Sequence, residues 1–191
     1  MIKIYCLLIG YLAGCFQTAY IVGRIFNVDI KRFGSRNAGA TNISRALGKF
    51  AGISVALIDI LKSIAIYFLC IFLFKEKIFG LYAGLGVVLG HNFTFYLKFN
   101  GGKGVASTGG LLMAFDWRVG LLIFLIWLAS VLLIRKIFFG AIISAVVLPF
   151  ILFFYRFEIE PIIILSLLSL IVLLKHISNF KKIICDKENT S

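Results

Sequence analysis

Long uncharged apolar stretches repeat along this chain and are separated by short polar connections. A helix needs about 20 consecutive apolar residues to cross the hydrocarbon core of a bilayer. Divided at that length, the pattern predicts seven helical segments, of which the fourth and fifth are short and are expected to form a hairpin. The predicted segments are Ile4–Gly23, Phe50–Phe74, Ile78–Leu97, Val105–Ala114, Val119–Ile134, Ile137–Tyr155 and Pro161–Leu174. Five or six helices are the alternatives that the pattern leaves open.

The composition excludes the ordinary water-soluble class. Hydrophobic residues make up 61% of the 191 residues and charged residues only 15%, whereas soluble domains are about half apolar and about a quarter charged. The mean hydropathy is +1.05. We therefore expect an all-α, polytopic integral membrane protein that forms a single membrane-embedded domain over residues 1–191.

Basic residues are divided unevenly between alternate connections. Of the 20 Lys and Arg residues, fourteen lie in one set of connections, five lie in the other, and Lys62 lies within a predicted helix. Positively charged connections are retained in the cytoplasm. The amino terminus is thus expected outside and the carboxyl terminus in the cytoplasm, with most of the net charge of +12 on the inner face, where it also attracts anionic lipid headgroups.

Three of the predicted cytoplasmic segments combine hydrogen-bond donors with a cation: Gly34–Asn42, Asn100–Gly104 and Lys175–Asn179. Glycines let a ligand approach the backbone closely. In the second segment, three glycines flank Lys103 directly before a predicted helix, so that backbone N–H groups and the helix dipole would face an anion. A flexible turn is the alternative interpretation. The Walker A motif is excluded, because Gly104 follows the lysine where Ser or Thr is required.

Charged and metal-binding side chains are sparse elsewhere. Asp59 and Lys62 lie three residues apart in the second predicted span and are expected to face the bundle and pair. Asp29 is the only carboxylate in the predicted cytoplasmic connections before the tail, so a magnesium site is not expected. The four cysteines have no Cys-x-x-Cys spacing, which favours neither a zinc site nor a disulfide framework. His91 could bind a ligand, but a purely structural role near a helix end is the alternative interpretation for a single histidine.

Three motifs of the chain resemble those of the bacterial PlsY family: GSRNAGATN with Arg45 after it, GHNFTFYLKFNGGKGVAST, and KHISNF. The segment Asp59–Lys62 also resembles a family segment. The resemblance implies a seven-helix fold in the bacterial inner membrane with a cytoplasmic active site. It further implies transfer of a fatty acyl group from acyl phosphate to glycerol 3-phosphate, giving lysophosphatidic acid. The sequence departs from the family at Arg36, where glycine is common, and at Thr94, where proline is common.

The residue types in the three motifs, taken with this resemblance, lead to a hypothesis about individual roles. Expected catalytic residues are Ser35, Arg45, Lys103, His176 and Asn179, and expected substrate-binding residues are Asn37, Gly39, Thr41, Asn42, His91, Gly101, Gly102 and Gly104. The cations, Ser35 and the glycine N–H groups would hold phosphates, while His176 and Asn179 would position and help deprotonate the attacking hydroxyl. The expected partners are acyl phosphate, glycerol 3-phosphate and membrane lipid, with no cofactor, metal, nucleic acid or obligate protein partner.

Two alternatives stay open beside this interpretation. A membrane transporter for phosphorylated anions would also need cations and glycine-rich backbone, but transporters place such groups near the bilayer midplane within repeated halves. Here the polar clusters gather at one face, and no internal repeat is evident. An acyl-serine intermediate is the other alternative; direct transfer is expected, because no carboxylate is placed to orient a Ser–His pair.

Overall fold

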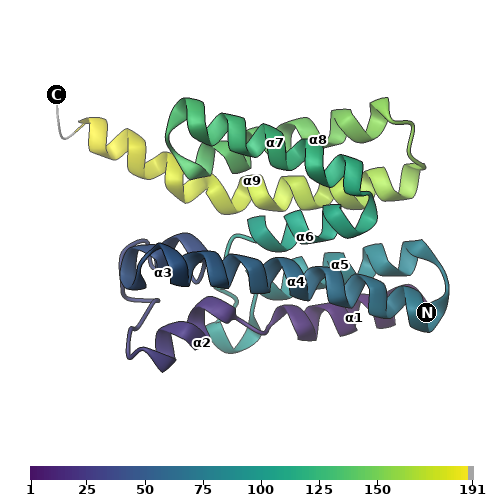
Figure 1. Cartoon of the computed structure of the whole chain (residues 1–191), viewed down its shortest axis with the longest axis horizontal. Coiled ribbons are helices and arrows are strands. Elements are labelled where there is room, and N and C mark those ends of the chain that lie inside the picture. Colours follow the sequence, from purple (N-terminus) through teal and green to yellow (C-terminus); the bar gives the residue numbers. More distant parts are fainter. Residues whose placement is uncertain (189–191) are drawn as a thin grey trace. The chain divides into compact units, whose positions relative to one another are not determined.

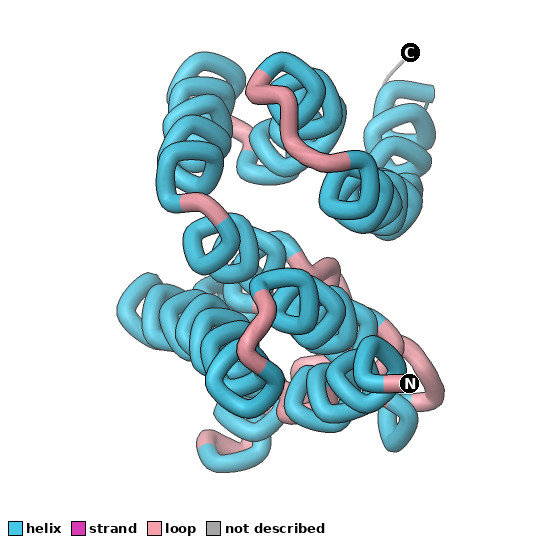
Figure 2. The backbone as a smooth tube through the Cα atoms, turned by 90° about the vertical axis from the view of Figure 1, so that its right-hand side faces the viewer, coloured by secondary structure: helices cyan, strands magenta, loops and turns pink. Residues whose placement is uncertain are grey.

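The computed structural model describes residues 1–188, and the side chains of residues 1–177. All elements in this part of the chain are helical (Figures 1 and 2). Six stretches are long and apolar enough to cross a membrane, and Val105–Phe115 is a shorter apolar helix. The prediction of an all-α polytopic membrane fold with about seven helices, some of them short, is therefore confirmed. The chain divides into two compact units, Met1–Gly120 and the remainder from Leu121.

The first unit holds most of the predicted site residues. Its helices α1, α4, α5 and α6 run alongside one another, and α2 continues the path of α1 after a break (Figure 1). α5 packs against α1, α4 and α6, and α4 also packs against α3. The elements are α1 (Ile2–Gly14), α2 (Thr18–Ile25), α3 (Ala40–Leu47), α4 (Lys49–Phe74), α5 (Lys77–Asn92), the 3-10 helix η1 (Phe95–Leu97), α6 (Val105–Phe115) and the start of α7 (Trp117–Ile134).

The second unit consists of the rest of α7, α8 (Ile137–Phe154) and α9 (Ile159–Glu188). α8 packs on α9, and the hydroxyl of Ser144 on α8 donates to the carbonyl of Ile123 on α7 at 3.5 Å. The last span was predicted to end at Leu174. Instead α9 continues helically through the third motif, so that this segment is not a loop.

Glycines bring α1 and α5 into backbone contact. A Cβ atom added at Gly10 would overlap the carbonyl of Ala83, and one added at Gly86 would overlap the carbonyl of Leu7. Lipid gives little hydrophobic drive for two apolar helices to associate, so close van der Waals packing between small residues holds them together. These contacts fix the register of α1 against α5.

The first span was predicted as one continuous helix, and this prediction is wrong. α1 ends at Gly14 and α2 begins at Thr18, although the two together still form one candidate span, Ile2–Ile25. A helix break inside a membrane leaves backbone groups that lipid cannot satisfy. Polar side chains from α4 and η1 meet them: Lys62 donates to the carbonyl of Phe16 at 3.0 Å, and Tyr96 donates to that of Cys15 at 2.6 Å.

Helix α3 lies partly where the sequence predicted a polar loop. It begins at Ala40, inside the first motif, after Gly39 in an extended conformation. Ile43 is fully buried within a cluster that also contains Val55 of α4. The helix escaped prediction because it is short and half of its residues are polar, and a search for long apolar runs does not detect such a helix. Its last turn carries Arg45.

The backbone contact between α1 and α5 makes a testable prediction. Gly86→Ala should lower the free energy of unfolding by about 2 kcal/mol, since the new methyl group overlaps backbone atoms that cannot move aside. The matched control is Gly109→Ala in α6, where an added Cβ would have no neighbour within 4 Å. In detergent, the apparent Tm of the Gly86 variant should fall while that of the Gly109 variant stays equal or rises. Equal Tm values in both variants would contradict this packing.

Candidate active site

Asn42 organises the first polar loop, which precedes α3. Its side chain is buried, and Nδ2 lies 3.1, 3.0 and 3.1 Å from the carbonyl oxygens of Ile30, Phe33 and Asn37. Its Oδ1 accepts a hydrogen bond of 3.1 Å from the backbone N–H of Ser35. One amide thus fixes the shape of the loop that carries Ser35. The prediction that Asn42 also contacts substrate stays a prediction.

Two residues of this loop have left-handed backbone conformations. Gly34 has φ 54°, and a Cβ atom there would lie 2.6 Å from Oδ1 of Asn42, so this position requires glycine. Arg36 has φ 57°, a conformation that costs a residue with a Cβ atom about 1 kcal/mol. The glycine that is common in the PlsY family at position 36 would avoid this cost. Arg36 nevertheless adopts this conformation in this chain.

The second polar loop is held on the carboxyl-terminal end of α5. The backbone N–H groups of Gly101 and Gly102 donate to the carbonyls of Asn92 and His91, at 3.2 and 2.9 Å. Gly104 then adopts φ 75° and caps α6. The first N–H groups of a helix lack intrahelical partners, and this end carries the positive pole of the dipole. The glycine loop therefore leads directly into an electropositive helix terminus.

The two loops lie against each other. Nζ of Lys31 donates to the carbonyl of Asn100 at 2.6 Å, and a Cβ atom added at Gly102 would lie 2.8 Å from the carbonyl oxygen of Ala38. Partial burial lowers the pKa of Lys31, and the carboxylate of Asp29 opposes this shift. The first two motifs, far apart in sequence, thus form one continuous polar region.

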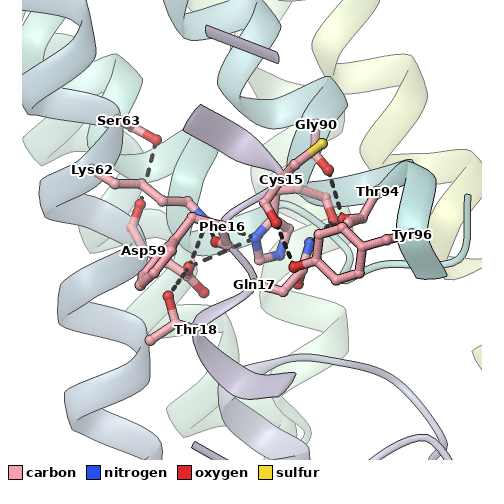
Figure 3. A network of polar contacts seen from close by, with 11 residues as sticks. Cys15, Phe16, Gln17, Thr18, Asp59, Lys62, Ser63, Gly90, Thr94 and Tyr96 are labelled. Atoms are coloured by element: carbon pink, nitrogen blue, oxygen red, sulfur yellow. Dashed lines mark hydrogen bonds and ion pairs between the residues drawn. The ribbon is translucent and has the colours of Figure 1, made fainter. Parts of the chain in front are cut away.

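A buried polar network adjoins this region (Figure 3). Asp59 and Lys62 of α4 form an ion pair at 2.8 Å, which confirms the predicted pairing. Asp59 also accepts a hydrogen bond of 2.9 Å from the hydroxyl of Thr18. Nζ of Lys62 lies 3.2 Å from Nδ1 of His91. The network therefore links α4, the break between α1 and α2, and the end of α5.

Gln17 reinforces the same junction from the helix break. Its Nε2 donates to the carbonyl of His91 and to the hydroxyl of Thr94, which itself donates to the carbonyl of Gly90 at 2.7 Å. The carbonyl of His91 thus receives two donors, one from Gln17 and one from Gly102. These bonds fasten the glycine loop to both α5 and the break.

The third motif lies on α9 in the second unit. His176 is buried, and its Nδ1 lies 2.7 Å from the carbonyl oxygen of Val172, one turn earlier. The helix continues past His176, although the last span was predicted to end at Leu174, so that His176 and Asn179 have the spacing of one helix face. The side chain of Asn179 lies outside the described side chains.

The remaining predicted residues have the following places. Thr41 and Arg45 lie exposed on α3, and Lys103 is partly buried in the glycine loop. All predicted site residues except the two on α9 belong to the first unit. The contact between the two polar loops brings together the segments that carry seven of them: Ser35, Asn37, Gly39, Gly101, Gly102, Lys103 and Gly104. Their individual roles stay predictions.

The chemistry of the region suits an anion. In the part of the chain that the structure describes, no group of three His, Cys, Asp or Glu residues is placed to hold a metal ion. The loops instead present Lys31, Lys103 and backbone N–H groups next to the start of α6. Cations and backbone amides are the partners that phosphate oxygens bind. The region can therefore hold a phosphoryl group and stabilise negative charge that develops beside it.

Sequence reasoning missed three residues that build this region, namely Lys31, Gln17 and Tyr96. Lys31 belongs to a set of basic residues that topology alone explained, so nothing set it apart. Gln17 is an uncharged polar residue inside an apolar stretch, and this was a signal of the helix break. Tyr96 is aromatic and sits near a predicted span end, where aromatic residues are common in any membrane protein.

Comparisons with known proteins agree with one another. Residues 4–186 match the model of the family described as glycerol-3-phosphate acyltransferase. Glycerol-3-phosphate acyltransferase 1 of Oceanobacillus iheyensis is 36% identical over 189 residues, which cover 95% of this chain and 91% of that protein.

Two crystal structures of PlsY (YgiH), an integral membrane glycerol 3-phosphate acyltransferase, are also similar. The glycerol 3-phosphate form has a TM-score of 0.89 and the lysophosphatidic acid form one of 0.87. Each is 28% identical, with 96% of this chain and 92% of the other covered. The resemblance drawn from the three motifs is thereby confirmed, and the chain belongs to the glycerol-3-phosphate acyltransferase (PlsY) family of integral membrane acyltransferases.

Proposed function

We propose that this protein transfers a fatty acyl group from acyl phosphate to the primary hydroxyl of glycerol 3-phosphate, giving lysophosphatidic acid and phosphate. The observation that carries the proposal is the contact between the Ser35 loop and the Lys103 loop. Both substrates are phosphorylated, and these loops offer cations, a hydroxyl and backbone amides side by side. The names of the relatives, and the two PlsY forms, support glycerol 3-phosphate as the acceptor.

The reaction needs orientation more than strong base catalysis. Acyl phosphate is a mixed anhydride with a good leaving group, so the hydroxyl oxygen attacks the acyl carbon and the carbon–oxygen bond to phosphate breaks. The bonding electrons leave with phosphate. Lys103, Arg45, Ser35 and the N–H groups at the start of α6 hold the phosphates and stabilise the charge that develops on the leaving group. The N–H groups of Gly101 and Gly102 instead shape the loop, because they donate to the carbonyls of Asn92 and His91.

His176 and Asn179 position the attacking hydroxyl and help to remove its proton. A backbone carbonyl can only accept, so the contact of Nδ1 with the carbonyl of Val172 favours the tautomer with the proton on Nδ1. In that tautomer, Nε2 carries the lone pair that a general base requires. The phosphate of the acceptor is the alternative proton acceptor.

The acyl chain lies among the transmembrane helices, while the polar acceptor arrives from the cytoplasm. The protein accordingly lies in the bacterial inner membrane with both loops on the cytoplasmic face, and the uneven distribution of basic residues between alternate connections supports this part of the proposal. It works without a cofactor or an obligate protein partner.

Lys103→Ala tests the central role of the glycine loop. Purified protein in detergent should form lysophosphatidic acid from palmitoyl phosphate and glycerol 3-phosphate, and the variant should do so at least about 100-fold more slowly, since a preorganised charge is lost. Lys98→Asn is the control: it removes a nearby exposed cation, and asparagine tolerates the left-handed backbone at φ 53°. Near-normal turnover in Lys103→Ala would remove Lys103 from the mechanism. No product from the wild type would end the proposal.

Direct transfer predicts that Ser35 never carries the acyl group. After brief incubation with radiolabelled palmitoyl phosphate in the absence of acceptor, the denatured protein should retain no covalent label above that of Ser35→Ala. Label that appears on Ser35, and is chased by glycerol 3-phosphate, would establish an acyl-enzyme instead.

The proposed orientation is tested at the two ends of α4. This helix of 26 residues is about 39 Å long at 1.5 Å per residue, enough to cross a bilayer. Lys49→Cys and Glu76→Cys place exposed thiols at its opposite ends, in a background with Cys185→Ser; Cys6, Cys15 and Cys70 are buried. A membrane-impermeant thiol reagent should label position 76 in intact spheroplasts and position 49 only after lysis. The reverse pattern would invert the topology.

A further inference from the structure

The helix break between α1 and α2 requires hydrogen-bond donors, but it does not require the charges of Asp59 and Lys62. Isolated charges within a membrane are costly and tend to mark functional sites. Two carbonyls of the break receive side-chain donors from other elements, and that of Cys15 receives the neutral hydroxyl of Tyr96. A neutral donor would serve Phe16 equally well. The ion pair, with side chains 10% and 3% exposed, therefore calls for a second explanation.

Lys62 has no donor left for a substrate. An ammonium group has three N–H bonds, and three acceptors surround Nζ: Asp59 Oδ1 at 2.8 Å, the carbonyl of Phe16 at 3.0 Å and Nδ1 of His91 at 3.2 Å. Because each bond has its partner, Lys62 acts on its neighbours rather than on a ligand. It is the wrong residue for a catalytic cation and a suitable one for holding His91.

His91 separates the ion pair from the glycine loop. With Lys62 donating to Nδ1, the neutral ring carries its proton on Nε2. Nε2 packs directly on Gly102, because a Cβ atom at that position would overlap it. The backbone of the same histidine accepts the N–H of Gly102 at 2.9 Å. Ring and backbone of His91 thus fix Gly102 from two directions (Figure 3 shows the network on the side of the ion pair).

We infer that Asp59 and Lys62 are positioning residues that, through His91, hold the Asn100–Gly104 loop in the conformation that receives a substrate phosphate. This inference rests on the proposed function, since it assigns the loop to phosphate binding. Two neighbouring residues support these contacts: Thr18 donates a hydrogen bond to Asp59, and Gln17 donates one to the carbonyl of His91. Loss of the pair should weaken phosphate binding while the reacting groups themselves stay intact.

The test neutralises both charges together, so that no unpaired charge is left in the membrane. Asp59→Asn with Lys62→Met keeps the side-chain volumes similar, and KM and kcat are measured for each substrate. The KM for one phosphorylated substrate should rise about 10-fold or more, because misplaced binding groups lose preorganisation. The change in kcat should be smaller. Gly102→Ala, which displaces the loop directly, should raise the KM for that same substrate.

A second ion pair provides the matched control. Asp116 and Arg118, at 2.7 Å, lie beyond the other end of α6. Asp116→Asn with Arg118→Met should leave both KM values unchanged. Unchanged KM values in the Asp59/Lys62 double variant, or a rise for a different substrate than in Gly102→Ala, would overturn the inference and leave the pair as a structural support for the helix break.

Two further measurements keep the inference open to refutation. If the double variant does not fold, His91→Gln, which leaves the ion pair in place, must raise the same KM, and an unchanged KM overturns the inference. If the wild type forms no lysophosphatidic acid, the proposed function fails, and ligand binding is then read from the rise in apparent Tm with glycerol 3-phosphate. A rise in the wild type that is lost in the double variant supports the positioning role. Equal responses overturn it.

Discussion

The backbone contact between α1 and α5 is the constraint on which the site depends. Glycines at positions 10 and 86 let the two helices touch without intervening side chains. This contact fixes the position of α1 along the axis of α5, and so places the break after α1 beside the carboxyl-terminal end of α5. The bonds from Gln17 to His91, and from His91 to the glycine loop, form only at that register.

A broken helix in lipid would be unfavourable without polar partners, and the protein supplies donors for the break from two other elements. A side chain of α4 and one of η1 reach the freed carbonyls, and Gln17 of the break reaches α5 in turn. The interactions that make the break tolerable are therefore the same ones that join it to the polar loops. Stability and the geometry of the site have a common origin in this protein.

The sequence predicted most of the membrane architecture, because long apolar runs have few alternatives in a bilayer. It also predicted the Asp59–Lys62 pair, since two opposite charges one turn apart in a span have few other partners. The break after Gly14 and helix α3 were missed, because both depend on tertiary contacts of short polar segments. Lys31 was missed for a related reason: its bond to Asn100 joins loops 69 positions apart, and no local pattern encodes that contact.

The hydrogen bonds of Asn42 affect how much of the favourable contact energy of a bound ligand is offset by ordering the loop. A loop with little regular structure normally loses conformational entropy when a ligand orders it, and affinity falls by that amount. Here one buried amide holds four backbone groups of the loop in place before any ligand arrives. The loop has already lost this entropy during folding. A small and strongly hydrated solute can therefore be bound by few contacts, and the loop keeps its conformation when the solute leaves.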